Sequence, residues 1–168
     1  MFTENNYVYT PGKKYGDEYA KTPIGELTNK SDVISLKLPL GGTSFATPIK
    51  NIEVVEYEED AAPITVYDCV FENSMGNRYT VQLEPSDIEV FCKYSEFKNL
   101  GLLLQWSANF CTLDWRGIPA KLISATPVEY TGRRFYKITT KETPSILIGG
   151  ITFGSRNESI GLDIDDIR

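Results

Sequence analysis

The sequence predicts an all-β protein, built as an antiparallel β-sandwich or a small barrel with an extended N-terminal arm. Two observations predict this class. Apolar and polar residues alternate along most of the chain, and β-branched and aromatic residues flank short turns rich in Gly and Asn. We count eight to ten strands and almost no helix. The 168 residues suffice for one domain with an apolar core, so we expect an arm over 1–30 and a single β domain over 31–168.

The arm is predicted because prolines and glycines interrupt every period of 2 or 3.6 in residues 1–30. Four of the ten tyrosines nevertheless lie in the first 19 residues. Disordered segments are poor in aromatic residues, and tyrosine gains most when its ring is buried, so we expect the arm to dock on a surface. That surface is either its own domain or a neighbouring subunit, and the sequence does not decide between them.

Strands are predicted from Val33 onward. Residues 33–38 and 49–57 alternate, and residues 64–71 and 78–83 flank a Gly/Asn turn, which predicts a hairpin. The apolar run 102–106 is typical of a buried central strand. Residues 121–130 and 133–140 flank Thr131-Gly132, and we interpret them as a second hairpin. A last strand with a glycine bend is predicted over 146–153.

Two interpretations remain for residues 84–99. Ser86 and Glu89 have the spacing of a capping box, which would begin a helix that continues through Asn99. Alternatively, residues 85–87 form one 3₁₀ turn between two short strands, with a further helical turn over 94–98. We favour the second interpretation because the apolar residues fit a helical face only loosely.

The strand rhythm of residues 66–91 is similar to that of the final strands of SH3-like small barrels, and an OB-like barrel is the related alternative. This likeness is one of pattern and implies no function. Similar turns 56 residues apart also leave open two barrel halves, over 31–92 and 100–156.

The composition excludes several kinds of active site. The chain has no histidine, so a Ser-His-Asp or Cys-His nucleophile and an imidazole metal site are impossible. Neither a P-loop nor a GxSxG motif occurs. The spacing of Cys69, Cys92 and Cys111 fits neither a redox pair nor zinc knuckles, which favours buried free thiols. We therefore expect no enzyme, no catalytic residue, no metal and no cofactor.

Charge divides the chain into an acidic front (1–92), a basic middle (93–156) and an acidic end (157–168), with a net charge of −6. Complementary segments of this kind can neutralise one another within one fold or between copies in an assembly. In such an assembly, tyrosines of the arm would anchor on a neighbour, and two arginines would meet an acidic cluster of another copy or a partner protein. These candidate partner-binding residues are Tyr7, Tyr9, Tyr15, Glu56, Glu58, Glu59, Asp60, Arg133 and Arg134.

The leading functional hypothesis is a non-enzymatic structural protein of a bacteriophage or other viral particle, such as a head, connector, tail or baseplate component. It would act as a homo-oligomer or in a larger protein assembly. One alternative is a single-stranded nucleic-acid-binding protein that uses the basic, aromatic segment 93–156. Another is a small acidic inhibitor of a host enzyme. No signal peptide or membrane span is predicted, because the longest uncharged stretch covers only 99–113, so a virion or host cytoplasm is expected.

Overall fold

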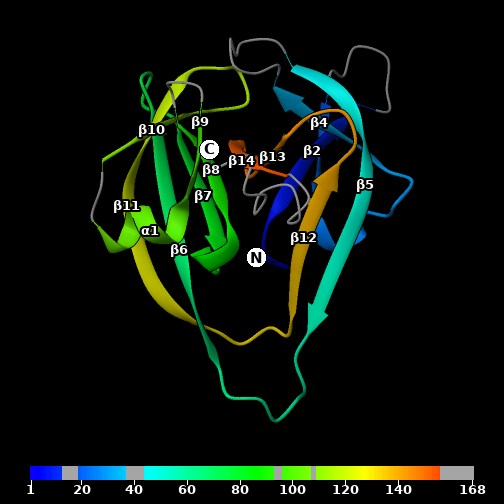
Figure 1. The fold of residues 1–168 in the computed structure, drawn as a ribbon, viewed down its shortest axis with the longest axis vertical. Helices are drawn as coiled ribbons and strands as arrows, with labels where there is room; N and C mark the ends of the chain where they lie inside the picture. Colours follow the sequence, from blue (N-terminus) through cyan, green and yellow to red (C-terminus); the bar gives the residue numbers. More distant parts are fainter. Residues whose placement is uncertain (13–18, 37–43, 93–95, 107–108, 156–168) are drawn as a thin grey trace, which may run out of the picture.

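Two antiparallel β-sheets make up nearly all of the structure, which is a computed structural model describing residues 1–12, 19–36, 44–92, 96–106 and 109–155 (Figure 1). The predicted all-β class is therefore confirmed. The acidic C-terminal end lies outside the described residues. Within them, no helix is both long enough and apolar enough to cross a membrane.

The larger sheet contains eight strands. Their order across the sheet is β10 (Cys111–Leu113), β11 (Pro119–Tyr130), β6 (Ile64–Asn73), β7 (Arg78–Leu83), β1 (Phe2–Thr3), β12 (Arg134–Thr140), β5 (Ser44–Glu56) and β4 (Asp32–Leu36). The smaller sheet has the order β3 (Tyr19–Pro23), β2 (Tyr7–Pro11), β13 (Ser145–Ile148), β14 (Ile151–Gly154), β8 (Glu89–Cys92) and β9 (Glu96–Asn99). Three short helical segments complete the described chain: η1 (Ile24–Glu26), η2 (Pro85–Asp87) and α1 (Leu100–Gln105).

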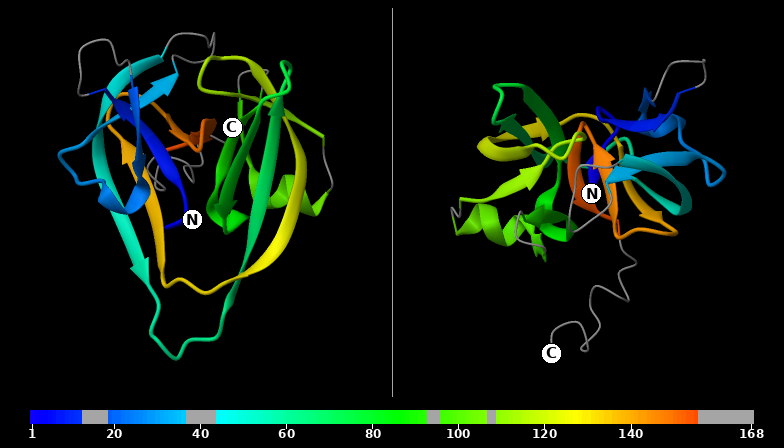
Figure 2. Two further views of the ribbon diagram at one scale, coloured as in Figure 1. Left: turned by 180° about the vertical axis from the view of Figure 1, so that it is seen from behind. Right: turned by 90° about the horizontal axis from the view of Figure 1, so that it is seen from above.

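Two long strand pairs, β5–β12 and β6–β11, form curved ribbons that converge at one end of the molecule (Figure 2). The predicted hairpin of β6 and β7 is confirmed, since Glu72 pairs with Arg78 next to the turn. The second predicted hairpin is wrong, because β11 and β12 follow one another but each pairs with an earlier strand. Buried Tyr130 and Phe135 pack in one cluster where the ribbons meet, so burial of these rings closes the ribbons together.

The run 102–106 was predicted to be a strand and instead belongs to α1 and its C-terminal cap. Asn99 caps the helix, accepting a hydrogen bond from the Leu102 backbone N–H at 3.0 Å. Leu100 and Leu103, three residues apart, are buried, while Leu102 is exposed. This is the one-sided burial expected of a helix. Leucine is also a strong helix former, so these residues form a capped helix and not the strand that the apolar run predicted.

Residues 85–87 form the predicted 3₁₀ turn, and no helix runs from it to residue 99. The helical turn expected over 94–98 is not seen in its described part, because residues 96–99 form strand β9. Its first residues lie outside the described chain.

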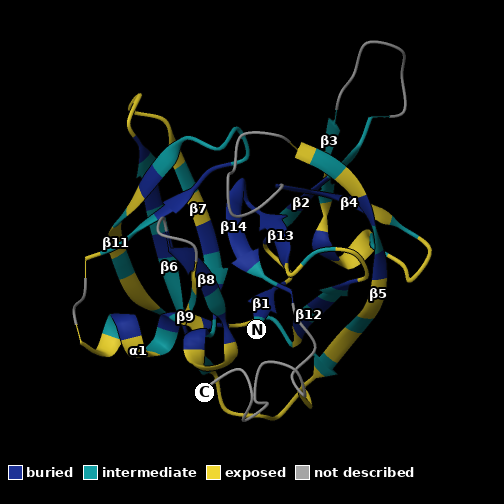
Figure 3. Ribbon diagram, turned by 45° about the horizontal axis from the view of Figure 1, so that its top comes forward, coloured by how far each residue is buried: buried dark blue, intermediate teal, exposed yellow. Residues whose placement is uncertain are grey.

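The core lies between the two sheets, where Figure 3 shows the buried residues of β1, β8, β13 and β14. Phe153 packs edge-on against Phe2 at 5.1 Å and against Phe71 at 6.2 Å between ring centroids. The glycine bend predicted in the last strand is a tight turn between β13 and β14. Gly150 has a φ of +88°, and a Cβ there would lie 2.8 Å from the Tyr79 ring, so glycine is required on both grounds.

The N-terminal segment, expected to be an arm, contributes strands to both sheets. β1 pairs with β7 on one side and β12 on the other, and β2 pairs with β13 in the smaller sheet. Phe2 and Val8 are buried in the main core. Residues 2–12 and 19–26 are thus folded onto the chain's own domain, and β1 lies between β7 and β12 in the larger sheet.

Candidate functional site

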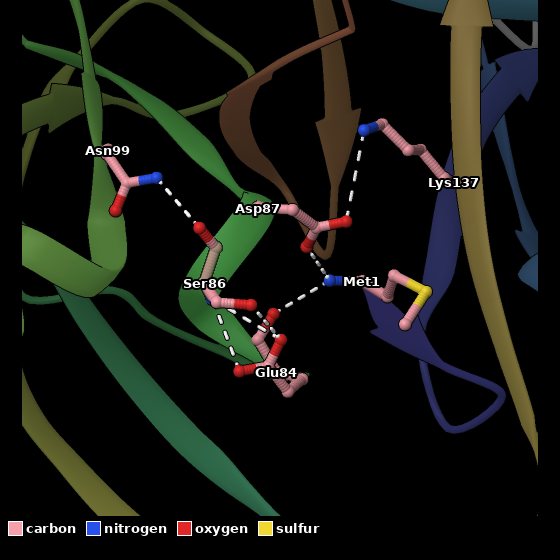
Figure 4. A network of polar contacts seen from close by, with 6 residues as sticks. All are labelled: Met1, Glu84, Ser86, Asp87, Asn99 and Lys137. Atoms are coloured by element: carbon pink, nitrogen blue, oxygen red, sulfur yellow. Dashed lines mark hydrogen bonds and ion pairs between the residues drawn. The ribbon is translucent and has the colours of Figure 1, made fainter. Parts of the chain in front are cut away.

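The α-nitrogen of Met1 is partly buried and lies in a network of polar groups (Figure 4). In this structure it is an ammonium that donates to an Asp87 carboxylate oxygen at 2.5 Å and to the backbone carbonyl of Glu84 at 2.7 Å. The Met1 carbonyl accepts from the Glu84 backbone N–H at 2.8 Å. Both the nitrogen and the carbonyl of Met1 are therefore bonded to the turn that begins at Glu84.

That turn is η2, which carries the chain from β7 of the larger sheet to β8 of the smaller one. Pro85 occupies its first position, where its missing N–H costs nothing. The Glu84 carboxylate caps the turn by accepting from the Ser86 backbone N–H at 3.3 Å, and the Ile88 N–H closes it onto the Pro85 carbonyl at 3.2 Å. The sequence thus fixes the carboxylate of Asp87 on a short, locally bonded turn.

Lys137 reaches the same carboxylate from β12, a strand of the larger sheet (Figure 4). Its Nζ lies 3.8 Å from the Asp87 Oδ2, while the Oδ1 of Asp87 contacts the Met1 nitrogen. The Lys137 side chain is only 21% exposed, so its charge is less screened than a surface lysine's. The site therefore has one carboxylate between two cationic groups, one from the residue that precedes β1 and one from β12.

Burial lowers the pKa of the Met1 amino group below its ordinary value of 8.0. The Asp87 charge and its hydrogen bond raise that pKa in part, and the positive charge of Lys137 lowers it. Burial has the largest effect, so the neutral amine is favoured relative to an exposed chain end. The arrangement suits chemistry in which a proton moves between this nitrogen and Asp87.

A second carboxylate, Asp114, is fully buried but acts in the structure rather than in a site. Its Oδ2 accepts from Asn73 Nδ2 and the Tyr79 hydroxyl, and its Oδ1 from the backbone N–H groups of Arg116 and Ile118, all at 2.9 Å. With four donors, both oxygens are satisfied. Across the described segments, no group of three or more Cys, Asp or Glu residues is placed to hold a metal ion.

The structure brings together the predicted arginines and part of the acidic cluster within one chain. Arg134 Nε lies 3.4 Å from a Glu56 carboxylate oxygen. Arg133 donates to the backbone carbonyls of Glu58 and Glu59, the second at 2.6 Å. Asp60 lies in the same exposed loop. These contacts join the ribbons where they converge, and a contact of these residues with another molecule stays a prediction.

The predicted tyrosines lie in a different place. Tyr7 and Tyr9 are on β2 and stack with ring centroids 5.8 Å apart, and Tyr9 also stacks on Tyr19 at 5.4 Å. Trp115 completes the cluster, 4.8 Å from the Tyr19 ring. The cluster therefore packs against the chain's own smaller sheet. Tyr15 lies outside the described residues.

Sequence reasoning missed the residues that meet at the centre: Met1, Glu84, Asp87 and Lys137. The one local signal was the Pro85-Ser86-Asp87 turn between two strands, which was predicted as a turn but not as a site. The sequence carried no signal for Lys137, because its partner Asp87 lies 50 residues earlier in the chain, on the η2 turn.

No protein-family model matches the sequence, and curated protein sequences give no match either. Solved structures do match. A bacterial intein-like domain from Clostridium thermocellum superposes with a TM-score of 0.66 at 11% identity, covering 92% of this chain and 97% of that one. A DnaB intein from Synechocystis sp. PCC 6803 gives 0.64 at 10% identity, with coverages of 93% and 98%. The gp41-1 intein gives 0.57 at 12% identity, with coverages of 93% and 97%.

The fold resembles that of inteins. Inteins are protein-splicing domains, and this finding overturns the functional hypotheses drawn from the sequence. The expected bacteriophage or viral structural component is wrong, and so are the alternatives of a single-stranded nucleic-acid binder and an acidic inhibitor. The expectation that the chain is not an enzyme is contradicted too, because inteins catalyse splicing. These hypotheses failed because they rested on charge and aromatic composition, and the structure places those residues in contacts within the chain.

Proposed function

We propose that the chain is a protein-processing domain that acts on the peptide bond whose nitrogen belongs to Met1. One observation carries the proposal: the Met1 nitrogen lies in a partly buried polar network, 2.5 Å from Asp87, in a fold that resembles the inteins. A carboxylate and a lysine are costly to hold in a partly buried place for packing alone. Their convergence on a backbone nitrogen supports a role in proton transfer to that nitrogen.

The chemistry follows from the requirements of amide cleavage. An amide nitrogen is a poor leaving group until it accepts a proton, so a general acid must lie within hydrogen-bond reach. Asp87 meets this requirement, and its protonated form can donate directly to the Met1 nitrogen. The Glu84 carbonyl orients the N–H, and Lys137 stabilises the carboxylate that remains after the proton has left. The amine that is released has a lowered pKa, which favours its departure in the neutral form.

The test is a chain with a short peptide fused ahead of Met1, incubated at acidic, neutral and basic pH and followed by mass spectrometry. We expect release of the peptide and a new α-amine at Met1. Asp87→Asn should slow release by about 10²- to 10⁴-fold, the usual effect of losing a general acid. Asp32→Asn, at an exposed position, is the matched control and should leave the rate unchanged.

Circular dichroism of each variant separates loss of chemistry from loss of fold. The proposal is refuted if the folded, unsubstituted fusion releases no peptide at any pH. It is equally refuted if folded Asp87→Asn releases peptide at the unsubstituted rate.

A further inference from the structure

We infer that Ser86 is the nucleophile of this site and that Glu84 is its general base. This inference rests on the proposed function and deepens it by naming the atom that attacks the peptide carbonyl. It assigns a chemical role to η2 beyond holding Asp87 on the Met1 nitrogen.

A nucleophile is needed from outside residue 1, because the Met1 side chain is a thioether. A thioether has no proton to lose and cannot accept the acyl group in the way a hydroxyl or thiol does. Of the six residues drawn in Figure 4, Ser86 alone carries a hydroxyl. Cys69 and Cys92 are buried, and burial raises the pKa of both thiols, so neither is suited to this role.

The Ser86 hydroxyl already has a base in place. Its Oγ donates to the Glu84 Oε2 at 2.5 Å, which is the short distance of a charge-assisted bond between a hydroxyl and a carboxylate. The same carboxylate accepts the Ser86 backbone N–H at 3.3 Å, so the turn fixes its orientation. A nucleophile within hydrogen-bond reach of a base that is itself oriented by a third group is the arrangement that activates serine.

Asn99 holds this pair in position from the opposite side. Its Nδ2 donates to the Ser86 carbonyl at 2.9 Å, while its Oδ1 caps α1 through the Leu102 N–H at 3.0 Å. The Leu100 N–H also donates to the Ile88 carbonyl at 2.8 Å. The turn is therefore bonded to the start of a helix, and Asn99 is a positioning residue for Ser86.

Glu84 contacts both Ser86 and the nitrogen that must leave. The Glu84 carbonyl contacts the Met1 nitrogen, and the Glu84 carboxylate contacts the Ser86 hydroxyl (Figure 4). Glu84 thus links the attacking oxygen to the nitrogen that must leave. Ser86 is exposed, so an acyl group and water can reach it.

The reaction balances without a cofactor. Ser86 Oγ attacks the carbonyl carbon that precedes Met1, and its proton passes to the Glu84 carboxylate. The C–N bond breaks, the nitrogen takes a proton from Asp87, and an ester of Ser86 forms. The Glu84 proton then passes to solvent and Asp87 takes up a proton from solvent, so both groups return to their starting forms. Water attacks the ester with the Glu84 carboxylate as base, Glu84 passes that proton to the departing Ser86 oxygen, and the upstream chain leaves as a carboxylic acid. One water is consumed for each peptide bond broken.

Two measurements test the inference. The first uses the chain without an added peptide and a fluorophosphonate, a probe that labels activated serines, followed by peptide mapping. We expect labelling at Ser86 that is abolished by Ser86→Ala and reduced at least tenfold by Glu84→Gln. Ser31→Ala, which removes an exposed turn hydroxyl bonded to Thr28, should leave the labelling intact.

The second uses Ser86→Cys in the chain with the added upstream peptide. A thiol at this position should form a thioester, which hydroxylamine captures as the peptide hydroxamate, and the same treatment of Ser86→Ala should yield none. Asn99→Ala should slow formation of this product without abolishing it. A positioning role predicts this partial loss, since the nucleophile itself is unchanged.

The outcomes separate the two proposals. If the peptide is released equally fast by Ser86→Ala, water attacks directly, and the inference falls while the proposed function stands. If Ser86 is labelled but no peptide is released, the activated serine stands and the proposed function falls. Absence of both labelling and hydroxamate in folded protein overturns the inference outright.

Discussion

Replacing the buried Asp114 by alanine should strongly destabilise the fold. Asp114 is fully buried and joins three parts of the chain, since its carboxylate binds Asn73 at the end of β6, Tyr79 on β7 and the loop residues Arg116 and Ile118. The alanine variant leaves all four donors without their acceptor and opens a small cavity.

The size of the effect follows from how far water can replace the carboxylate. An unsatisfied buried donor costs about 1–3 kcal/mol. Asn73 is buried, whereas Tyr79, Arg116 and Ile118 are partly exposed and can recover bonds to solvent. We therefore expect a loss of roughly 3–5 kcal/mol, a large part of the ~5–15 kcal/mol by which domains are stable. Asp114→Asn should cost less, because its amide oxygen still serves two donors.

Urea denaturation, followed by tryptophan fluorescence and circular dichroism, measures this difference. With a slope of about 2 kcal/mol per M, a loss near 4 kcal/mol lowers the unfolding midpoint by about 2 M. Asp32→Asn, an exposed carboxylate at the start of β4, is the control and should leave the midpoint in place. A shift below about 0.5 M for Asp114→Ala would refute the argument that this carboxylate organises the loop.

Two further predictions concern titration. Burial lowers the pKa of the Met1 amino group, so the unfolded chain binds this proton more tightly than the folded one. The stability that the neutral Met1 amine contributes should be complete above the ordinary pKa of 8.0 and be lost as the pH falls through the folded pKa. An NMR titration of the labelled amine should give a midpoint below 8.0. Asp87→Asn should lower that midpoint further. Burial also raises the pKa of Cys69 to about 12, so this thiol should resist an aromatic disulfide reagent in the native protein at about pH 8 and react once urea unfolds it. Rapid native labelling of Cys69 would contradict that burial.

Much of the fold could be predicted because strand periodicity and turn chemistry are local. The β6–β7 hairpin and the 3₁₀ turn of η2 follow from alternation and from Pro85-Ser86-Asp87. Strand pairing at long range could not be predicted in the same way. Residues 121–130 and 133–140 have the sequence of a hairpin, yet each strand pairs with an earlier one, and Tyr130 packs with Phe135 where the two strands follow one another.

The candidate site was hidden for a related reason. Asp87, Lys137 and the Met1 nitrogen come from a turn, a central strand and the chain start, and none carries a local motif. Dense charge and aromatic residues, which were expected to carry the function, lie elsewhere. In the structure Arg134 pairs with Glu56 on the exposed surface, where such pairs contribute little, and Tyr9 packs into the smaller sheet.

The shortest strand explains why chemistry at Met1 and the architecture are connected. β1 has two residues, yet it lies between β7, which leads into η2, and β12, which carries Lys137. Phe2 anchors it by packing on Phe153. Because residue 1 precedes this anchored strand directly, its nitrogen has little freedom to leave the centre. Asp87 follows β7 and Lys137 lies on β12, so the strand pairing that places β1 between them also assembles the site.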